Sequence, residues 1–216
     1  MDWTQALDGY CERVGPEYWS EPVNALTNLA FLVAALVMWR RVTDPLGRLL
    51  CILLGMIGIG SYLFHTHAQI WSALADVGPI VGFILVYVYA ANLHFWNMSR
   101  FWSGIGVLLF FPYVMGAAYL FNALPFFHIS AGYWPVALLI GGYGFALRHR
   151  AKRTAGGLAL GAAILALSLF LRSIDEMVCA QLPVGTHFLW HILNGIMLGW
   201  MIEVHRRHIA ENRASA

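Results

Sequence analysis

Polar side chains that can do chemistry lie in a stretch of the chain, residues 58–79, that joins two long apolar segments. This stretch holds the Ser61 hydroxyl, the His65 imidazole and the Asp76 carboxylate. A second polar group follows near the C-terminus, where His187 and His191 are four residues apart. On a helix, residues four apart project from the same face, about one turn from each other. Ser61 and His65 have the same spacing, so each pair should face one side of its helix.

Histidines that converge in this way indicate zinc, because neutral imidazole is a good zinc ligand. A catalytic zinc site has three protein ligands and a water molecule whose pKa falls to about 7. A nearby carboxylate such as Asp76 could relay the proton of that water to a leaving group. A hydroxyl such as that of Ser61 could hydrogen-bond a developing oxyanion. Hydrogen-bonded core histidines would show the same spacing, which alone does not decide between the two interpretations.

The composition identifies the chain as an integral membrane protein. Of its 216 residues, 60% are hydrophobic and only 11% are charged. In soluble domains about a quarter of the residues are charged. The mean hydropathy of +0.66 agrees with a chain that is largely surrounded by lipid. We therefore expect the lipid bilayer and a membrane lipid as partners, and no nucleic acid.

Seven apolar stretches are long enough to span a membrane. A span of about 30 Å takes roughly 20 helical residues, because a helix satisfies its own backbone hydrogen bonds in lipid. Proline residues and charged runs separate the stretches. The sequence predicts an all-α fold, a bundle of seven transmembrane helices at residues 23–41, 46–65, 73–92, 102–122, 132–148, 155–172 and 186–204.

The distribution of basic residues predicts the orientation of this bundle, because cytosolic loops carry an excess of Lys and Arg. With seven spans, eleven of the 13 Lys and Arg residues fall on one side, and only Arg13 and Arg172 on the other. The N-terminus is therefore expected outside and the C-terminus in the cytosol. The chain is predicted to form one membrane domain over 1–216, with an outer N-terminal segment at 1–22 and a cytosolic tail at 205–216. His65, Asp76 and His187 then lie at the outer level.

Several blocks of the sequence resemble the alkaline ceramidase family, part of a superfamily of seven-span membrane hydrolases that includes the adiponectin receptors and the Per1-like proteins. GIGSYLFH, which ends at His65, is similar to a family block of glycine, serine, three residues and histidine. Asp76 follows His65 by eleven residues, as in the family. Three further blocks resemble the family in order along the chain: YCERVGPEYWSEPVNALTN at 10–28, RSIDEMVC at 172–179 and HFLWHILNG at 187–195.

The resemblance implies a role for each of the residues singled out above. His65, His187 and His191 would bind Zn²⁺, Asp76 would handle protons, and Ser61 would assist the reacting carbonyl group. The implied reaction is hydrolysis of the amide bond of ceramide, or of a similar N-acyl lipid, to a sphingoid base and a fatty acid. Cys11 and Cys179 match the positions of a family disulfide. Asp175 and Arg172, which lie close in sequence, are expected to form a local ion pair.

The N-terminal block of the family also holds a calcium ion, and here the sequence departs from the family. Gly9 stands where the family has an acidic residue, and Val14 replaces an asparagine. The gap between Cys11 and Glu21 is two residues shorter than in the family. Two interpretations stay open, a solvated acidic segment and a Ca²⁺ site formed by Asp8, Tyr10, Glu12 and Glu21.

Other functions fit the same residues. A seven-span receptor or channel-like protein with a structural zinc would use the three histidines, but it leaves Asp76 and Ser61 without a catalytic task. A hydrolase of another membrane lipid also fits, because apolar walls discriminate poorly between lipid chains. Short loops favour a bacterial inner membrane, with the site toward the periplasmic face.

Overall fold

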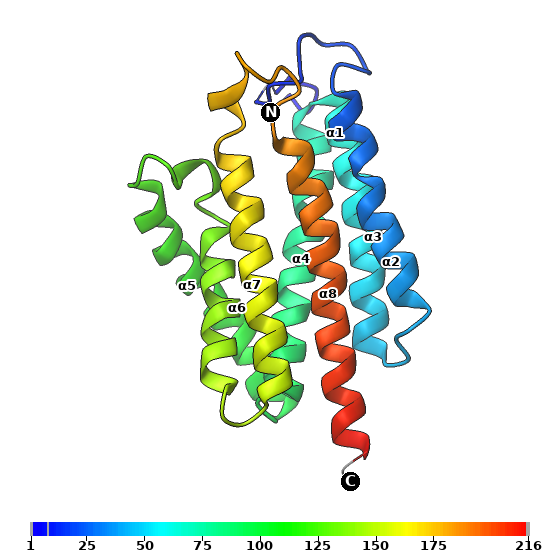
Figure 1. Cartoon of the computed structure of the whole chain (residues 1–216), viewed down its shortest axis with the longest axis vertical. Helices are drawn as coiled ribbons and strands as arrows, with labels where there is room; N and C mark the ends of the chain where they lie inside the picture. The colour runs from blue at the N-terminus through cyan, green and yellow to red at the C-terminus, as the bar shows by residue number, and fades with distance from the viewer. Residues whose placement is uncertain (1, 8, 215–216) are drawn as a thin grey trace.

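α-Helices and two short 3₁₀ helices make up the regular structure in the computed structural model, which describes residues 2–7 and 9–214. The long helices run up and down along one axis, with the two chain ends at opposite ends of the bundle (Figure 1). The predicted all-α class is confirmed. The elements in chain order are α1 (Pro22–Thr27), α2 (Leu29–Trp39), α3 (Pro45–His67), α4 (Ile70–His94), α5 (Arg100–Asn122), η1 (His128–Ser130), α6 (Trp134–Leu147), α7 (Lys152–Ser173), η2 (Glu176–Val178) and α8 (His187–Ala214).

The connection between α3 and α4 places two of the predicted site residues side by side. α3 ends where Ala68 adopts the left-handed backbone conformation, with a φ of 45°. α4 begins immediately afterwards, and Gln69 and Ser72 form a capping box that satisfies backbone N–H groups at its start. So short a connection makes the two helices antiparallel neighbours. The end of α3, with Ser61 and His65, therefore lies beside the start of α4, with Asp76.

Five helical segments of the described residues are long and apolar enough to cross a membrane: Pro22–Trp39, Pro45–His67, Ile70–His94, Arg100–Asn122 and Lys152–Ser173. The first of these combines α1 and α2, which meet at Asn28. α6 is apolar but has only 14 residues, about 21 Å of helix. α8 is long, but its polar residues keep it outside this set. The described residues thus form a helical protein with five candidate membrane spans, as in a multi-pass membrane protein.

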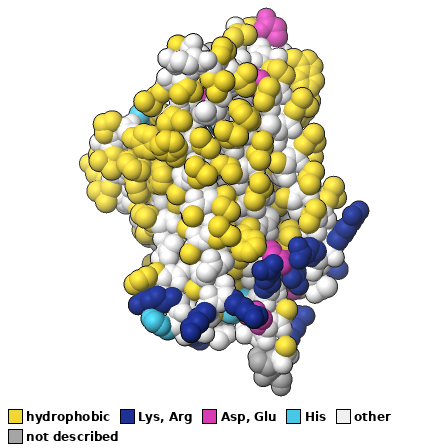
Figure 2. Space-filling model, in the orientation of Figure 1, with side chains coloured by type: hydrophobic (Ala, Val, Ile, Leu, Met, Phe, Trp, Pro, Cys, Tyr) yellow, Lys and Arg dark blue, Asp and Glu magenta, His cyan; other side chains and the backbone are white. Residues whose placement is uncertain are grey.

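The surface of the bundle separates apolar from basic side chains. On the face drawn in Figure 2, hydrophobic side chains cover the length of the bundle, and Lys and Arg side chains lie at the end that carries the C-terminus. A membrane protein needs this separation, because its sides face lipid and its ends face water. We refer to the two ends as the N-terminal end and the basic end.

Candidate metal centre

Three histidines meet at the N-terminal end of the bundle, where α3 ends and α8 begins. One ligand atom each from His65, His187 and His191 lies within 4.8 Å of the other two. The ring centres are 4.6–5.1 Å apart. All three side chains are buried. The structure therefore brings together, from two helices far apart in sequence, the three side chains that the sequence predicts as ligands.

Two hydrogen bonds determine which ring nitrogens carry protons. His65 Nδ1 lies 2.6 Å from Glu21 Oε2, and because a carboxylate only accepts, Nδ1 is the donor. His191 Nδ1 lies 3.0 Å from Thr27 Oγ1. The proton of that hydroxyl is directed to a backbone carbonyl oxygen of its own helix, so His191 Nδ1 also donates. Both rings therefore keep a lone pair on Nε2.

Two nitrogen atoms of the cluster are buried without a hydrogen-bond partner among the described residues, His187 Nδ1 and His191 Nε2. A buried polar atom without a partner costs about 1–3 kcal/mol. Binding a metal ion would remove this cost, because each free nitrogen would donate its lone pair to the ion. The residues present thus fit the zinc ion that the sequence resemblance implies.

Glu21, the residue before α1, connects His65 to Arg13. Its Oε1 accepts a hydrogen bond from Arg13 Nε (2.5 Å), and its Oε2 accepts from His65 Nδ1 and from Asn24 Nδ2 (3.1 Å). Burial raises the pKa of Glu21, but the hydrogen bonds from His65, Asn24 and Arg13 outweigh burial and hold its pKa below the usual range. Glu21 is therefore a carboxylate. A carboxylate behind a metal-binding histidine fixes the orientation of its ring.

Asp76 and Ser61 lie beside the histidines. Ser61 is buried on α3, and its hydroxyl interacts with the Asp76 carboxyl group, on which His65 also acts electrostatically. Gly60 permits this arrangement. A Cβ atom added to Gly60 would lie 2.0 Å from the Ala75 carbonyl oxygen and 3.1 Å from the Asp76 backbone nitrogen. A hydroxyl, a carboxyl group and three imidazoles are thus gathered in one site.

Comparison with models of protein families gives a match to the ceramidase family over residues 5–214. The chain belongs to the ceramidase family. The match covers nearly the whole chain, so it includes the N-terminal segment, the three histidines, Asp76 and Ser61. A comparison with curated proteins gives no match.

In this member of the family, the carboxylates considered for calcium are bonded within the protein. The two oxygens of Glu12 accept from the backbone N–H groups of Val23 (2.7 Å) and Asn24 (2.8 Å), so Glu12 caps the start of α1. Glu21 accepts hydrogen bonds from Arg13, His65 and Asn24. The Tyr10 carbonyl oxygen accepts one from the backbone N–H of Arg13 (3.2 Å). Asp8, the fourth residue considered, lies outside the described residues.

Arg13 supplies a positive charge next to Glu21. Besides Glu21, its guanidinium donates to the carbonyl oxygens of Gly15 (3.0 Å) and His65 (3.0 Å). The Arg13 and Glu21 side chains are 4% and 2% exposed, so the pair is shielded from water. Val14, which stands in place of the family's asparagine, is 91% exposed. The described residues therefore do not fit a calcium ion, because their carboxylate oxygens already bind a guanidinium and backbone N–H groups.

We expect the stability of this protein to be independent of calcium. Arg13→Gln should lower the free energy of unfolding by about 3–5 kcal/mol, because it leaves the buried charge of Glu21 without its partner. Thermal unfolding in detergent, with calcium or with a chelator, measures both effects. Arg40→Gln, at an exposed arginine, is the control. An increase in the melting temperature of the wild type on adding calcium would contradict the prediction.

A second prediction concerns the contact at Gly60. Gly60→Ala should lower the free energy of unfolding by about 1–3 kcal/mol, because its methyl group would collide with the backbone of α4. Gly104→Ala is the matched control, because a Cβ atom there meets nothing within 4 Å. In a helix alanine is otherwise favoured over glycine by about 0.5–1 kcal/mol. Equal stability changes in the two variants, measured by urea or thermal unfolding, would rule out the close contact.

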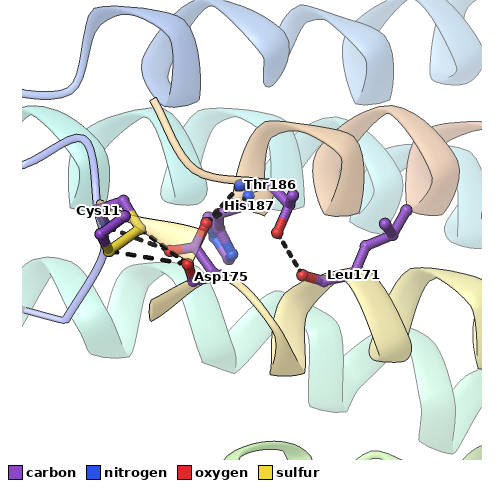
Figure 3. Close-up of a disulfide and its surroundings, with 6 residues drawn as sticks. Cys11, Leu171, Asp175, Thr186 and His187 are labelled. Carbon is purple, nitrogen blue, oxygen red and sulfur yellow. Dashed lines mark hydrogen bonds between the residues drawn. A yellow bond between two sulfur atoms is a disulfide. The ribbon is translucent and has the colours of Figure 1, made fainter. Parts of the chain in front are cut away.

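Asp175 holds the N-terminal segment against the start of α8 (Figure 3). Its Oδ1 accepts from the backbone N–H groups of Thr186 (2.6 Å) and His187 (2.8 Å), and its Oδ2 accepts from Cys11 N (3.1 Å). The predicted ion pair of Asp175 with Arg172 is wrong, because these three N–H groups occupy the carboxylate. Arg172 instead donates to η1.

The disulfide implied by the resemblance is present. It joins Cys11 to Cys179, whose Cα atoms are 5.1 Å apart, and it ties the N-terminal segment to the loop before α8 (Figure 3). Tyr10, next to Cys11, stacks on the ring of His187, with ring centres 3.8 Å apart. The disulfide and Asp175 together therefore keep the N-terminal segment packed over the histidine cluster.

An apolar cavity of about 80 Å³ lies inside the bundle beside the cluster. Two α8 residues next to His191 in the helix, Trp190 and Asn194, form part of its wall. The other walls come from α2, α3, α4, α6 and α7 and are almost entirely aliphatic and aromatic, as at Phe83 and Leu165. Pockets that hold whole ligands measure roughly 300–1,000 Å³, so this cavity has room for only part of a hydrocarbon chain.

Proposed function

We propose that this ceramidase-family protein is a zinc-dependent membrane amidohydrolase that cleaves the amide bond of ceramide or of a similar N-acyl lipid. The observation that carries the proposal is the pair of buried, unpartnered nitrogens, His187 Nδ1 and His191 Nε2, in a cluster beside Asp76. The match to the ceramidase family over nearly the whole chain supports the reaction class.

Each group in the site then has a task. Zinc bound by the three histidines would supply hydroxide at neutral pH and polarise the carbonyl group of the substrate. The Asp76 carboxylate would take the proton of the attacking water and give it to the leaving nitrogen, which departs as an amine. The Ser61 hydroxyl would donate a hydrogen bond to the oxygen of the reacting carbonyl group. The apolar cavity would hold part of a lipid chain and exclude water.

The proposal includes an arrangement in the membrane. α6 and α8 would complete seven spans, with the N-terminal end and the metal centre on the outer side and the basic end in the cytosol. The concentration of Lys and Arg at the basic end supports this orientation (Figure 2). A bacterial inner membrane, with the site toward the periplasm, accommodates it. A ceramide-like lipid would then enter sideways from the outer leaflet.

Mass spectrometry of lipids tests the reaction directly. The full chain, purified in detergent, is incubated with a panel of N-acyl lipids that includes a ceramide with a 16-carbon acyl chain. We expect equal amounts of fatty acid and amine, loss of both after treatment with a chelator, and recovery on adding zinc. If no N-acyl lipid of the panel is cleaved by zinc-loaded protein, the proposed function is wrong.

A further inference from the structure

A groove of about 680 Å³ lies at the basic end of the bundle, where α4 ends and α5 begins. The start of α3 and the last turns of α8 complete its walls, which include Pro45 and Ile209. We call it the basic groove. Its volume falls within the range of about 300–1,000 Å³ of pockets that hold whole ligands. The histidine cluster lies at the opposite end of α8, so the basic groove is separate from the proposed reaction site.

Two arginines give the basic groove its positive charge. Arg100 is the first residue of α5, and Arg213 lies near the end of α8. Both are exposed, and neither forms a salt bridge with another residue that the structure describes. By contrast, Glu203 binds three other arginines of this end, and Glu211 binds Arg153. The two charges of the basic groove are therefore available to a ligand.

The wall also contains one acidic residue, Asp44, whose carboxylate is engaged within the protein. Asp44 is only 9% exposed, and its Oδ2 accepts a hydrogen bond from Gly47 N (2.8 Å), which caps the start of α3. The basic groove thus combines two unpaired cations with one anion that already has a partner. This balance favours an anionic ligand over a cation.

His94 adds a hydrogen-bonding group to the wall. Its Nδ1 lies 2.9 Å from Nε2 of His205, which is buried on α8. His94 Nε2 has no hydrogen-bond partner in the part of the chain that the structure describes, and the side chain lines the basic groove. When His205 Nε2 donates to His94 Nδ1, His94 carries its proton on Nε2 and can donate it to a ligand. An anion in the groove would accept that hydrogen bond.

The remaining walls are largely apolar, as at Leu46, Leu93 and Ile209. A groove that combines cations with apolar walls matches a molecule with an anionic head and hydrocarbon chains. Its place in the bundle agrees, because Lys and Arg side chains gather where the hydrophobic side surface ends (Figure 2). Lipid head groups lie at this level of a membrane protein, and basic pockets between membrane helices bind anionic head groups.

We propose that the basic groove binds the phosphate head group of an anionic phospholipid. The guanidinium groups of Arg100 and Arg213 pair with the phosphate oxygens, which accept charge-assisted hydrogen bonds. The upper parts of the hydrocarbon chains contact the apolar walls. A zwitterionic phospholipid binds less tightly, because its head group carries a positive charge that the two arginines repel. The proposal is independent of the metal centre and of the proposed function.

Native mass spectrometry of the full chain, released from detergent micelles, tests this directly. It compares phosphatidylglycerol, which is anionic, with phosphatidylcholine of the same acyl chains. We expect the wild type to bind phosphatidylglycerol about 30-fold more tightly, as two basic residues beside an anionic lipid predict. The double variant Arg100→Gln/Arg213→Gln should lose this preference and bind phosphatidylcholine as the wild type does. A double variant that keeps the preference would overturn the proposal.

A matched control separates the basic groove from the overall charge of the basic end. Arg40→Gln/Lys152→Gln removes the same charge from two exposed residues that do not line the groove. This variant should keep the preference for phosphatidylglycerol. If it loses as much as Arg100→Gln/Arg213→Gln, the preference comes from general attraction to basic residues, and the site is refuted.

Thermal unfolding in detergent gives a second measurement. A ligand that binds only the folded protein raises its melting temperature, so phosphatidylglycerol should raise that of the wild type. Arg100→Gln/Arg213→Gln should unfold at the wild-type temperature without lipid, because both arginines are exposed, and should gain nothing from the lipid. An equal increase with inorganic phosphate at the same concentration would show that free phosphate suffices, which contradicts binding of a lipid.

Discussion

Replacement of His187 by alanine is expected to reduce amide hydrolysis by at least about 10³-fold. The reason is that the variant removes one of three metal ligands and, with it, the source of hydroxide and the polarisation of the carbonyl group. Release of fatty acid from the ceramide is the measurement. The loss should be the same for His65→Ala and His191→Ala, because a site with two ligands fails in the same way whichever ligand is missing.

Two controls keep this prediction specific. His128→Ala, at an exposed histidine near η1, should retain the activity of the wild type. Far-ultraviolet circular dichroism should show the same helix content in His187→Ala and in the wild type, because the disulfide and Asp175 still hold the start of α8. A His187→Ala protein that keeps more than a tenth of the activity would remove His187 from the chemistry.

Asp76→Asn should lower kcat by about 10²–10⁴-fold while the protein binds zinc as the wild type does. Asparagine has the shape of aspartate but cannot take up and release a proton. Asp76 is not among the three side chains that could hold a metal ion, so metal binding should be unaffected. Elemental analysis and the turnover rate, measured on the same preparation, separate the two effects. Ser61→Ala, which removes one hydrogen-bond donor, should show a smaller loss of about 10²–10³-fold.

The Asp76 variant also decides between an enzyme and a protein with a structural zinc. In a receptor or channel-like protein the three histidines would tie α3 to α8, and Asp76 would have no task. Asp76→Asn would then bind zinc normally and change nothing in lipid hydrolysis. An unchanged rate in Asp76→Asn would therefore exclude the proposed proton transfer.

The sequence predicts the helices and the histidine cluster because both depend on local patterns. Hydrophobic stretches mark the helices, and the spacing of His187 and His191 places both on one helix face. Two features of the spans could not be predicted in this way. The first predicted span is divided at Asn28 into α1 and α2, and α6 is only 14 residues long. A hydropathy pattern shows where apolar residues occur but not where a helix turns or ends.

The groups that support the histidines could not be predicted, because each acts across a long distance in sequence. Glu21 bonds to His65, 44 residues away, and Thr27 bonds to His191, 164 residues away. From the sequence, Glu21 is a candidate only for binding calcium. The contact of Gly60 with Ala75 depends on how closely α3 and α4 approach, and a glycine within a span gives no sign of its neighbour. Packing of the helices decides these contacts.

The departure from the family pattern near the N-terminus now has a physical explanation. Gly9 and Val14 replace two residues that the family uses for calcium. In this chain the guanidinium of Arg13 joins Glu21 to the His65 carbonyl oxygen instead. Arg13 thus places a buried positive charge beside Glu21, one of the carboxylates considered for calcium.

The metal content of the purified wild-type chain tests the central claim most directly. Elemental analysis, without added metal, should find about one zinc ion per chain. The His65→Ala, His187→Ala and His191→Ala proteins should contain almost none. Wild-type protein without a transition metal, and unable to bind zinc when it is supplied, would contradict the account.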